Sequence, residues 1–262
     1  MINYSFSLYD MEYFLLILCR VSAFVFVAPF FGMQRTPPNR YKVAFCVFTA
    51  MLLYQSLTPA QSEVTYNSVL GYSLIVLKEV ITGLLLGFGA NSCTSIVNFA
   101  GSVADMETGL SMATLMDPAT NQNTSITGVI YQYGFMLMLI ASGMYRYLLG
   151  ALADSFSLIP VNGAIFHSDR LLDSMLEFMT QYILIGFRIV LPIFCVILML
   201  NSVLGVLAKV APQMNMFAVG MQLKVIVGLG VLFLSMNMLG SISEFVFDEM
   251  KVMMTSFLEG MM

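Results

Sequence analysis

Charged residues are scarce in this 262-residue sequence, at 10% of the chain, whereas hydrophobic residues make up 59%. Soluble globular domains carry roughly 25% charged residues, so this composition excludes an ordinary soluble domain. The 11 Lys and Arg residues and 15 Asp and Glu residues leave a net charge of -4, with no basic block. A nucleic-acid partner would need such a block. The sequence therefore predicts an integral membrane protein that binds no nucleic acid.

Groups that could carry catalysis are also few. The only histidine, His167, lies in a polar stretch. Ser111 is the nearest approach to a nucleophile motif, but the second glycine of the usual nucleophile elbow does not follow it. The chain has no glycine-rich phosphate loop ending in Lys and Ser or Thr. We therefore predict that the protein is not an enzyme and hydrolyses no nucleotide.

Metal ligands are similarly sparse. The four cysteines lie singly within apolar runs, at no metal-ligand spacing. They are Cys19, Cys46, Cys93 and Cys195. Isolated cysteines in apolar surroundings usually behave as small buried hydrophobic residues, so we interpret them as buried free thiols. We predict that the protein holds neither a metal nor another cofactor.

Long apolar runs occupy most of the chain. A helix needs about 20 residues to cross roughly 30 Å of hydrocarbon, and six runs come close to that length or exceed it. They are Tyr13–Phe31, Tyr41–Leu57, Val69–Phe99, Ile126–Ile159, Phe178–Leu207 and a run after Asn215 that ends at Ile242. The N-terminal stretch has no positive region and no small-residue cleavage site, so the first run is expected to remain as a helix. The predicted fold is all-α, with about six long apolar helices, some of them broken.

Some charged residues lie inside these runs or at their edges, and we single out five of them. They are Arg20, Lys78, Glu79, Arg188 and Lys224. An unpaired charge at such a position costs about 3 kcal/mol or more, so each needs a partner. Because the acids are concentrated elsewhere, we expect other subunits or a water-filled cavity to supply some of these partners. The alternative for Arg20 and Lys224 is that their long side chains reach the lipid headgroups.

Glycine and proline indicate where helices approach one another or bend. Gly83 and Gly87 form a small-xxx-small pair that allows another helix to approach closely. Pro192 lies inside an apolar run, where it removes a hydrogen bond and favours a kink. Pro212 lies in a second proline loop that leads into the last run. We predict that these four residues, with Lys78, Glu79, Arg188 and Lys224, form contacts between helices or subunits.

The C-terminal stretch has a helical pattern of apolar residues. Apolar side chains recur at spacings of three and four, at Phe247, Met250, Met254, Phe257 and Met261. This spacing places them on one side of a helix. It predicts an amphipathic helix over residues 244–262.

The stretch from Ala100 to Thr127 separates two apolar runs and has an unusual composition. It contains the acids Asp105, Glu107 and Asp117 around an apolar core at residues 110–116. Asp117 followed by Pro118 is a good N-cap and N1 pair, which predicts a helix start. Irregular backbone at membrane depth is tolerated only where protein or water covers it, so we interpret this stretch as lying at a water-filled cavity. The alternative is an ordinary loop with a short surface helix.

Landmarks along almost the whole chain resemble, in order and spacing, the FliR/SctT family of type III export-gate proteins. The central landmarks are Ala100-Gly101, Gly109-Leu110-Ser111-Met112-Ala113-Thr114 and Asp117-Pro118. The others are Arg20 before Ala28-Pro29, the basic turn from Arg35 to Lys42, Lys78-Glu79 ahead of Gly83 and Gly87, Arg188 before Leu191-Pro192, and Ala211-Pro212-Gln213-Met214-Asn215-Met216-Phe217 with Gly220 and Lys224. Glu107 departs from the pattern, because family members tend to be less acidic there.

The resemblance implies a structural subunit of the export gate of a flagellum or injectisome, and we favour a flagellum. It implies one helical domain over residues 1–262, with a FliP-like half followed by a FliQ-like half and some helices raised out of the bilayer. A single copy would close a helical ring of FliP and FliQ. FlhA-like and FlhB-like export proteins would be further partners, and unfolded proteins would pass in transit. The expected location is the bacterial inner membrane, at the flagellar basal body.

The resemblance also identifies residues 109–116 with the plug of a closed pore. Methionine and leucine side chains exclude water and deform around any sequence that passes, so they suit a seal. We predict that Leu110, Met112, Leu115 and Met116 contribute to the seal, with Ser111 in the same segment and Gly109 as its hinge. The cap and the local electrostatics are assigned to Asp105, Glu107, Asp117 and Pro118.

A small secondary transporter of a solute is the alternative function. Such proteins use broken helices and an acid near the middle of the membrane, as Glu79 would be. The small size of the chain and the lack of a convincing internal repeat argue against it.

Overall fold

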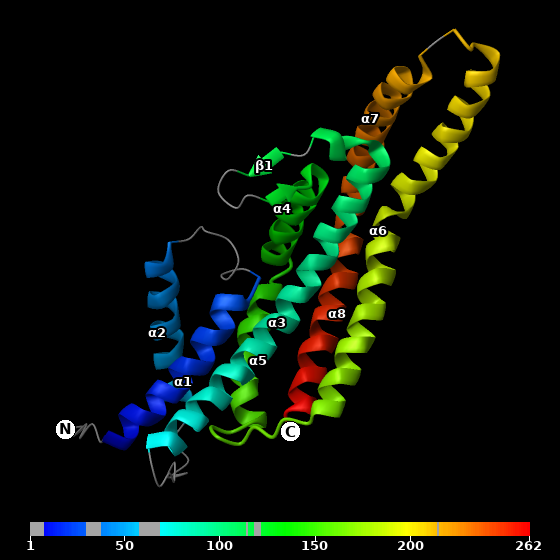
Figure 1. Ribbon diagram of the computed structural model, residues 1–262. Helices are drawn as coiled ribbons and strands as arrows, with labels where there is room; N and C mark the ends of the chain where they lie inside the picture. The colour runs from blue at the N-terminus through cyan, green and yellow to red at the C-terminus, as the bar shows by residue number, and fades with distance from the viewer. Residues whose placement is uncertain (1–7, 30–37, 58–68, 114, 118–121, 214) are drawn as a thin grey trace. The chain divides into compact units, whose positions relative to one another are not determined.

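The computed structural model describes residues 8–29, 38–57, 69–113, 115–117, 122–213 and 215–262, and helices dominate them (Figure 1). The α-helices are α1 (Leu8–Val27), α2 (Asn39–Ser56), α3 (Val69–Thr108), α4 (Ile126–Ala141), α5 (Met144–Leu158), α6 (Ser168–Val210), α7 (Met216–Ser235) and α8 (Leu239–Gly260). Two short 3-10 helices, η1 (Leu110–Ala113) and η2 (Met236–Met238), complete the helical part. The predicted all-α class is confirmed.

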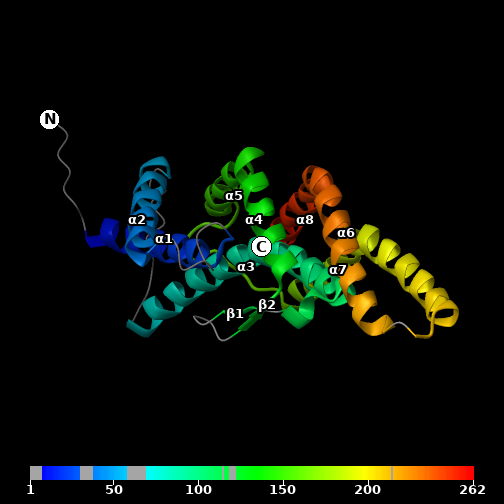
Figure 2. The same ribbon diagram turned by 90° about the horizontal axis from the view of Figure 1, so that it is seen from above.

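The described strands form one small hairpin in the central stretch. Strands β1 (Leu115–Asp117) and β2 (Gln122–Thr124) pair antiparallel, with Leu115 opposite Thr124 and Asp117 opposite Gln122 (Figure 2). Two strands of three residues each add little stability by themselves. The hairpin is therefore a local feature of the loop between α3 and α4.

Long apolar helices suit a membrane protein. Within the described residues, α3, α6 and the stretch from Ala218 to Gly260 are long and apolar enough to cross a membrane. Helices α4 and α5 make a fourth candidate if they count as one span, although they are bent by 71°. Gly143 lies at this bend with φ of 73°, in the left-handed region that glycine adopts readily. The expected number of about six is not confirmed, because α1 and α2 are not among these candidates.

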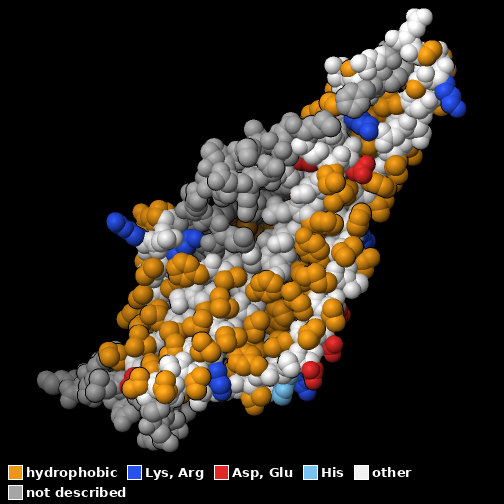
Figure 3. Space-filling view, viewed as in Figure 1, with side chains coloured by type: hydrophobic (Ala, Val, Ile, Leu, Met, Phe, Trp, Pro, Cys, Tyr) orange, Lys and Arg blue, Asp and Glu red, His pale blue; other side chains and the backbone are white. Residues whose placement is uncertain are grey.

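Many apolar side chains on these helices are exposed in the single chain, and Figure 3 shows them spread over the visible face. On α6, Leu184, Phe187 and Leu191 are each more than half exposed. Monomeric soluble proteins rarely show apolar surface of this extent. Lipid or other protein chains must therefore cover it.

The described chain divides into two compact units. The first comprises residues 1–92, 143–178 and 250–262, and the second comprises residues 93–142 and 179–249. In the first unit α1 crosses α3 at the two glycines predicted for a close approach. A Cβ atom at Gly83 would clash with the carbonyl oxygen of Arg20, and one at Gly87 would lie 2.9 Å from the carbonyl oxygen of Phe24. Only glycine leaves room for the two backbones here.

The C-terminal end of α8 belongs to the core of the first unit. Met250, Met254, Phe257 and Met261 are buried, at 2% exposure or less. A backbone hydrogen bond also attaches this end of the chain to the unit. The N–H group of Ile165 donates to the carbonyl oxygen of Met261 at 3.0 Å. The helix begins at Leu239, five residues before the expected start at Glu244.

The second unit is packed by aromatic and small side chains. Phe99 of α3 lies against Tyr182 of α6, with ring centroids 5.3 Å apart. Phe135 of α4 contacts Phe247 of α8 in the same way, at 5.1 Å. Paired rings of this kind stabilise a core beyond the area that they bury. They hold the helices that surround the loop between α3 and α4.

The glycine contact between α1 and α3 leads to a stability prediction. We expect Gly83→Ala to lower the thermal unfolding midpoint of the purified protein, because overpacking against backbone costs about 1–3 kcal/mol. The matched control is Gly150→Ala in α5, where a Cβ atom has open space. That variant should keep or slightly raise the midpoint, because alanine is a better helix former. Equal midpoints for the two variants would contradict the close approach.

Candidate functional site

A fully buried ion pair lies in the first unit. Arg20 of α1 and Glu79 of α3 both have 0% exposure, and the Arg20 Nε atom donates to the Glu79 Oε2 atom at 2.6 Å. The Arg20 Nη1 atom also donates to the carbonyl oxygens of Ser155 at 3.1 Å and Ile159 at 2.9 Å. The second carboxylate oxygen of Glu79 accepts from the N–H group of Asn162 at 2.9 Å. These contacts join α1, α3 and the chain after α5.

The end of α5 is suited to receiving the guanidinium. The carbonyl groups at the end of a helix carry a partial negative charge that attracts a cation. Arg20 also stacks on Phe156, with its Cζ atom 4.3 Å from the ring centroid. Asn162 turns the chain back toward Glu79 with φ of 67°, a conformation that asparagine tolerates better than most residues.

The ion pair corrects one expectation from the sequence. Arg20 does not reach toward headgroups, because it has 0% exposure, and its partner Glu79 comes from the same chain. The two residues are 59 positions apart. Lys78, which precedes Glu79 on α3, is half-buried, as is Lys224 on α7.

A second polar cluster lies in the second unit, at the base of the loop between α3 and α4. Asp105 is 1% exposed, and its carboxylate accepts from the Ser125 Oγ atom at 2.7 Å and from the Thr127 Oγ1 atom. The backbone N–H group of Thr127 points at both carboxylate oxygens at 3.3 Å. An acid at this position compensates the positive end of α4. Asp105 therefore connects the last turn of α3 to the start of α4.

Ser125 and two glycines complete this connection. Ser125 is the N-cap of α4, and its Oγ atom accepts from the N–H group of Gly128 at 2.9 Å. A Cβ atom at Gly101 would clash with the backbone of Gly128, so α3 and α4 approach without intervening side chains. The loop of residues 109–125 is thus closed at its base by a buried carboxylate and by direct backbone packing.

The loop itself begins at a glycine with a left-handed backbone. Gly109 follows the end of α3 with φ of 83°, and a Cβ atom there would meet nothing within 4 Å. Glycine adopts this left-handed conformation without strain, unlike other residues. Leu110 and Ser111 are half-buried in η1, and the chain continues into the hairpin. The side chains of Met112, Leu115 and Met116 lie outside the described part of the structure, so their predicted contacts remain predictions.

The start of α4 differs from the expectation. Asp117 closes strand β1, and α4 begins at Ile126 with Ser125 as its N-cap, instead of at Asp117 and Pro118. Pro118 itself lies outside the described residues. Residues Gln122 to Thr124 pair with β1, which delays the helix until the chain has left the hairpin.

A pocket of about 330 Å³ lies beside the predicted hinge. Glu107, Gly109 and Ser111 line it from the loop side, and Asn201 and Lys224 line it from α6 and α7. The structure therefore brings Glu107 and Lys224, of opposite charge, to one pocket, although their sequence positions gave no reason to pair them. Glu107 is half-buried there.

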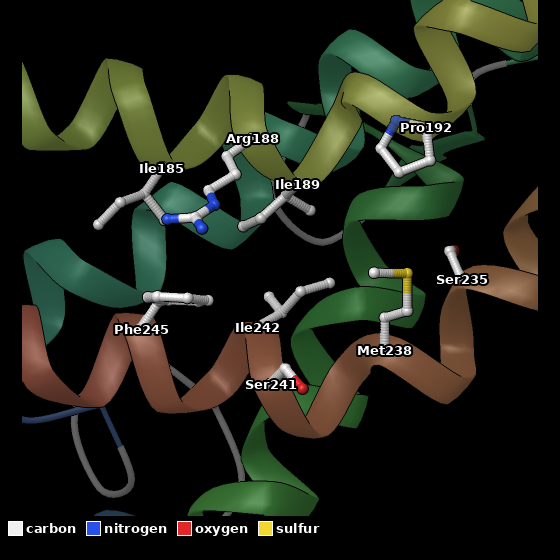
Figure 4. Close-up of a pocket in the computed structure, with 9 residues that line it drawn as sticks. All are labelled: Ile185, Arg188, Ile189, Pro192, Ser235, Met238, Ser241, Ile242 and Phe245. Carbon is white, nitrogen blue, oxygen red and sulfur yellow. The ribbon is translucent and has the colours of Figure 1, made fainter.

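The other predicted contact residues lie on α6 and after it. Arg188 is exposed and stacks on Phe245 of α8, with its Cζ atom 4.2 Å from the ring centroid. Pro192 is half-buried, and α6 continues through it to Val210. Pro212 is exposed in the turn between α6 and α7. Arg188 and Pro192 line a second pocket in this unit, of about 160 Å³ (Figure 4).

Comparison with known proteins identifies the family. The family described as "Bacterial export proteins, family 1" matches residues 11–250. The chain belongs to this family. The flagellar biosynthetic protein FliR of Bacillus subtilis is 28% identical over 238 residues, which cover 90% of each chain. FliR of Aquifex aeolicus is 30% identical over 222 residues, covering 84% of this chain and 83% of the relative.

A relative with a different name is also similar to this chain. The Yop proteins translocation protein T of Yersinia pestis is 29% identical over 170 residues, which cover 63% of this chain and 65% of the relative. The predicted resemblance to the FliR/SctT family is confirmed. The family member described here is therefore a component of a type III protein export apparatus, in which it acts with other export proteins.

Several residues of the two polar clusters were not expected from the sequence. Ser125 could have been found, because a serine directly before the apolar run at Ile126 is a common N-cap signal. Thr127 and Asn162 carry no comparable signal. Thr127 contacts Asp105, which lies 22 positions earlier in the chain, and Asn162 contacts Glu79, which lies 83 positions earlier. Only the fold brings these residues together.

The buried ion pair gives a prediction for the stability of this export protein. We expect Glu79→Gln to lower stability by about 3–5 kcal/mol, because it leaves the Arg20 charge buried without its partner. Glu177→Gln, at an exposed acid of the same unit, should leave the thermal unfolding midpoint unchanged. The double variant Arg20→Met, Glu79→Leu should recover much of the loss, because apolar pairs often replace buried ion pairs. A double variant no more stable than Glu79→Gln would argue against this account.

Asp105 gives a second prediction, for the base of the loop. Asp105→Ala should destabilise the first turn of α4 by about 2 kcal/mol, because charged hydrogen bonds are lost and buried donors stay unpaired. Hydrogen exchange of the amides at Thr127 and Gly128 should accelerate by roughly thirtyfold. Glu107→Gln, in the same helix but outside this cluster, is the control and should leave these amides protected. Unchanged protection in the Asp105 variant would show that the carboxylate does not hold the helix start.

Proposed function

We propose that the protein is a structural, non-enzymatic subunit of a type III export gate, where it helps to seal and gate a pore for unfolded proteins. The observation that carries this proposal is the loop at residues 109–125. Its base is held by the buried Asp105, and its entry is a glycine in open space. A segment that is anchored at its base and free to turn at one joint suits a gate.

The seal itself is assigned to the apolar core of that loop. Leu110, Met112, Leu115 and Met116 lie together with Ser111 directly after Gly109. A pore wide enough for a polypeptide leaks ions unless apolar side chains exclude water from it. Flexible thioether side chains can close around cargo of any sequence. A single loop could therefore block the pore at rest and yield to a substrate.

The surroundings of the loop support a controlled movement. Glu107, Gly109 and Lys224 line the same pocket of about 330 Å³, so space exists beside the joint. The opposite charges of Glu107 and Lys224 would attract one another across it. We assign to Glu107 and Lys224 the electrostatics of the resting position.

The assembly is proposed from the relatives and the exposed apolar surface. The FliR relatives favour a flagellar system in the bacterial inner membrane, at the basal body. We propose one helical domain that closes a ring with FliP-like and FliQ-like subunits as a single copy, its two halves resembling those subunits. FlhA-like and FlhB-like export proteins would be further partners. The exposed apolar residues of α6 would be covered in such an assembly.

A secondary transporter of a solute is a weaker second candidate. Its coupling acid would have to reach water or an ion from the membrane interior. Glu79, the acid considered for this role, is 0% exposed and paired with Arg20. It is therefore occupied by a structural contact.

The plug role predicts an electrical phenotype. Deletion of residues 109–116 should raise the ion conductance of the assembled gate in planar bilayers, because the apolar seal is removed. A variant that replaces residues 110–116 with glycine and serine at unchanged length should also leak, which separates chemistry from loop length. Ser102→Ala on the exposed face of α3 is the control and should conduct as the parent does. Unchanged conductance in a correctly assembled deletion variant would remove the plug role.

A further inference from the structure

The pocket beside Arg188 combines an apolar cavity with a charged side chain. Its volume is about 160 Å³, and it lies between α6 and the segment formed by η2 and the start of α8. In Figure 4, Arg188 reaches from α6 toward Phe245, while Ile189 of α6 faces Ile242 and Met238 on the opposite segment. Apart from Ser235 and Ser241, the lining is therefore apolar around a single guanidinium. We call it the Arg188 pocket.

This chain contacts the face of the Arg188 guanidinium but pairs no carboxylate with its edge in the described residues. Its face stacks on Phe245 at 4.2 Å. In the part of the chain that the structure describes, no carboxylate pairs with it. Stacking occupies the face of the planar group and leaves the N–H donors at its edge free. These edge donors are the ones that bind a carboxylate with two parallel hydrogen bonds.

Arg20 is both stacked and paired with a carboxylate of this chain, although its Nη2 atom has no hydrogen-bond partner among the described residues. Its face lies on Phe156 at 4.3 Å, and its edge donates to Glu79 at 2.6 Å. Arg188 has the corresponding aromatic contact, but it is exposed where Arg20 is buried. The comparison indicates that the missing element at Arg188 is a carboxylate from outside this chain.

The position of Arg188 favours a protein carboxylate over a lipid phosphate. No other charged residue lies in the run 178–207, so uncharged helix extends about 15 Å on one side of Arg188 and about 28 Å on the other. The flanking residues Leu184, Phe187 and Leu191 are more than half exposed and apolar. Headgroups at either end of such a run lie beyond the reach of one side chain, whereas a neighbouring helix passes along its whole length.

We propose that the Arg188 pocket is a docking site for an apolar helix of another membrane protein, which places an Asp or Glu against the Arg188 guanidinium. An apolar side chain of the same helix, one turn away, would fill the cavity between Ile189 and Ile242. Because the pair would be buried in an apolar contact, the pocket would strongly favour helices that carry an acid. An uncharged helix would leave the guanidinium desolvated and unpaired. This inference rests on the proposed function, since it specifies the chemistry of one subunit contact of the gate.

The test is photocrosslinking in intact membranes that contain the full export apparatus. A photoreactive amino acid at Ile242 inside the pocket is compared with one at Phe233, an exposed position of α7 outside it. From Ile242 we expect a crosslink to an apolar segment that contains Asp or Glu. Arg188→Gln should reduce the yield by about tenfold, because the partner's carboxylate loses its counter-charge. Neither effect should appear at Phe233.

A charge exchange completes the test. Arg188→Glu should abolish the crosslink, and replacement of the partner's acid by Arg should restore it. Crosslinking to phospholipid alone, a captured segment without an acid, or a yield unaffected by Arg188→Gln would each overturn the proposal. Failure of the plug deletion to change conductance would contradict the proposed function while leaving this crosslink intact, so the two failures are distinguishable.

Discussion

The ion pair between Arg20 and Glu79 is the constraint on which the first unit depends. Burying two charges costs several kcal/mol per ion, and only good geometry with further hydrogen bonds compensates for it. Here the carbonyl groups at the end of α5 and the N–H group of Asn162 supply those bonds. These contacts together fix how α1, α3 and the chain after α5 pack, although the Arg20 Nη2 atom is buried without a hydrogen-bond partner among the described residues. The glycine pair of α3 allows the approach that brings the two charges together.

The second unit applies the same principle at a smaller scale. Asp105 is a buried acid whose donors all come from the start of α4, so it fixes the base of the loop between α3 and α4. Just beyond it, Gly109 has open space and a left-handed backbone. A fixed base and a free joint in adjacent turns are what a movable plug needs. The proposed gating function follows from this contrast more than from any single apolar residue.

Arg20 and Arg188 both lie in apolar runs, but Arg20 is buried and Arg188 is exposed. Arg20 is paired within the chain, whereas Arg188 presents its donors on an exposed, apolar helix. An unpaired charge on an apolar membrane helix is costly, which supports the proposal that another molecule pairs with Arg188. Extensive exposed apolar surface on α6 has the same implication, because a member of an export apparatus is not complete as a single chain.

The sequence by itself determined the all-α class, the family and the close approach at Gly83 and Gly87, because helical period, motif order and small-residue spacing are local signals. It did not determine that Arg20 pairs with Glu79 or that Ser125 and Thr127 bind Asp105, since these contacts join residues far apart in the chain. The expected number of about six spans is not confirmed either, because hydropathy alone does not distinguish apolar surface covered by protein from that covered by lipid. Only the tertiary structure decides which charge meets which, because pairing depends on the packing of helices and not on the residues of any one of them.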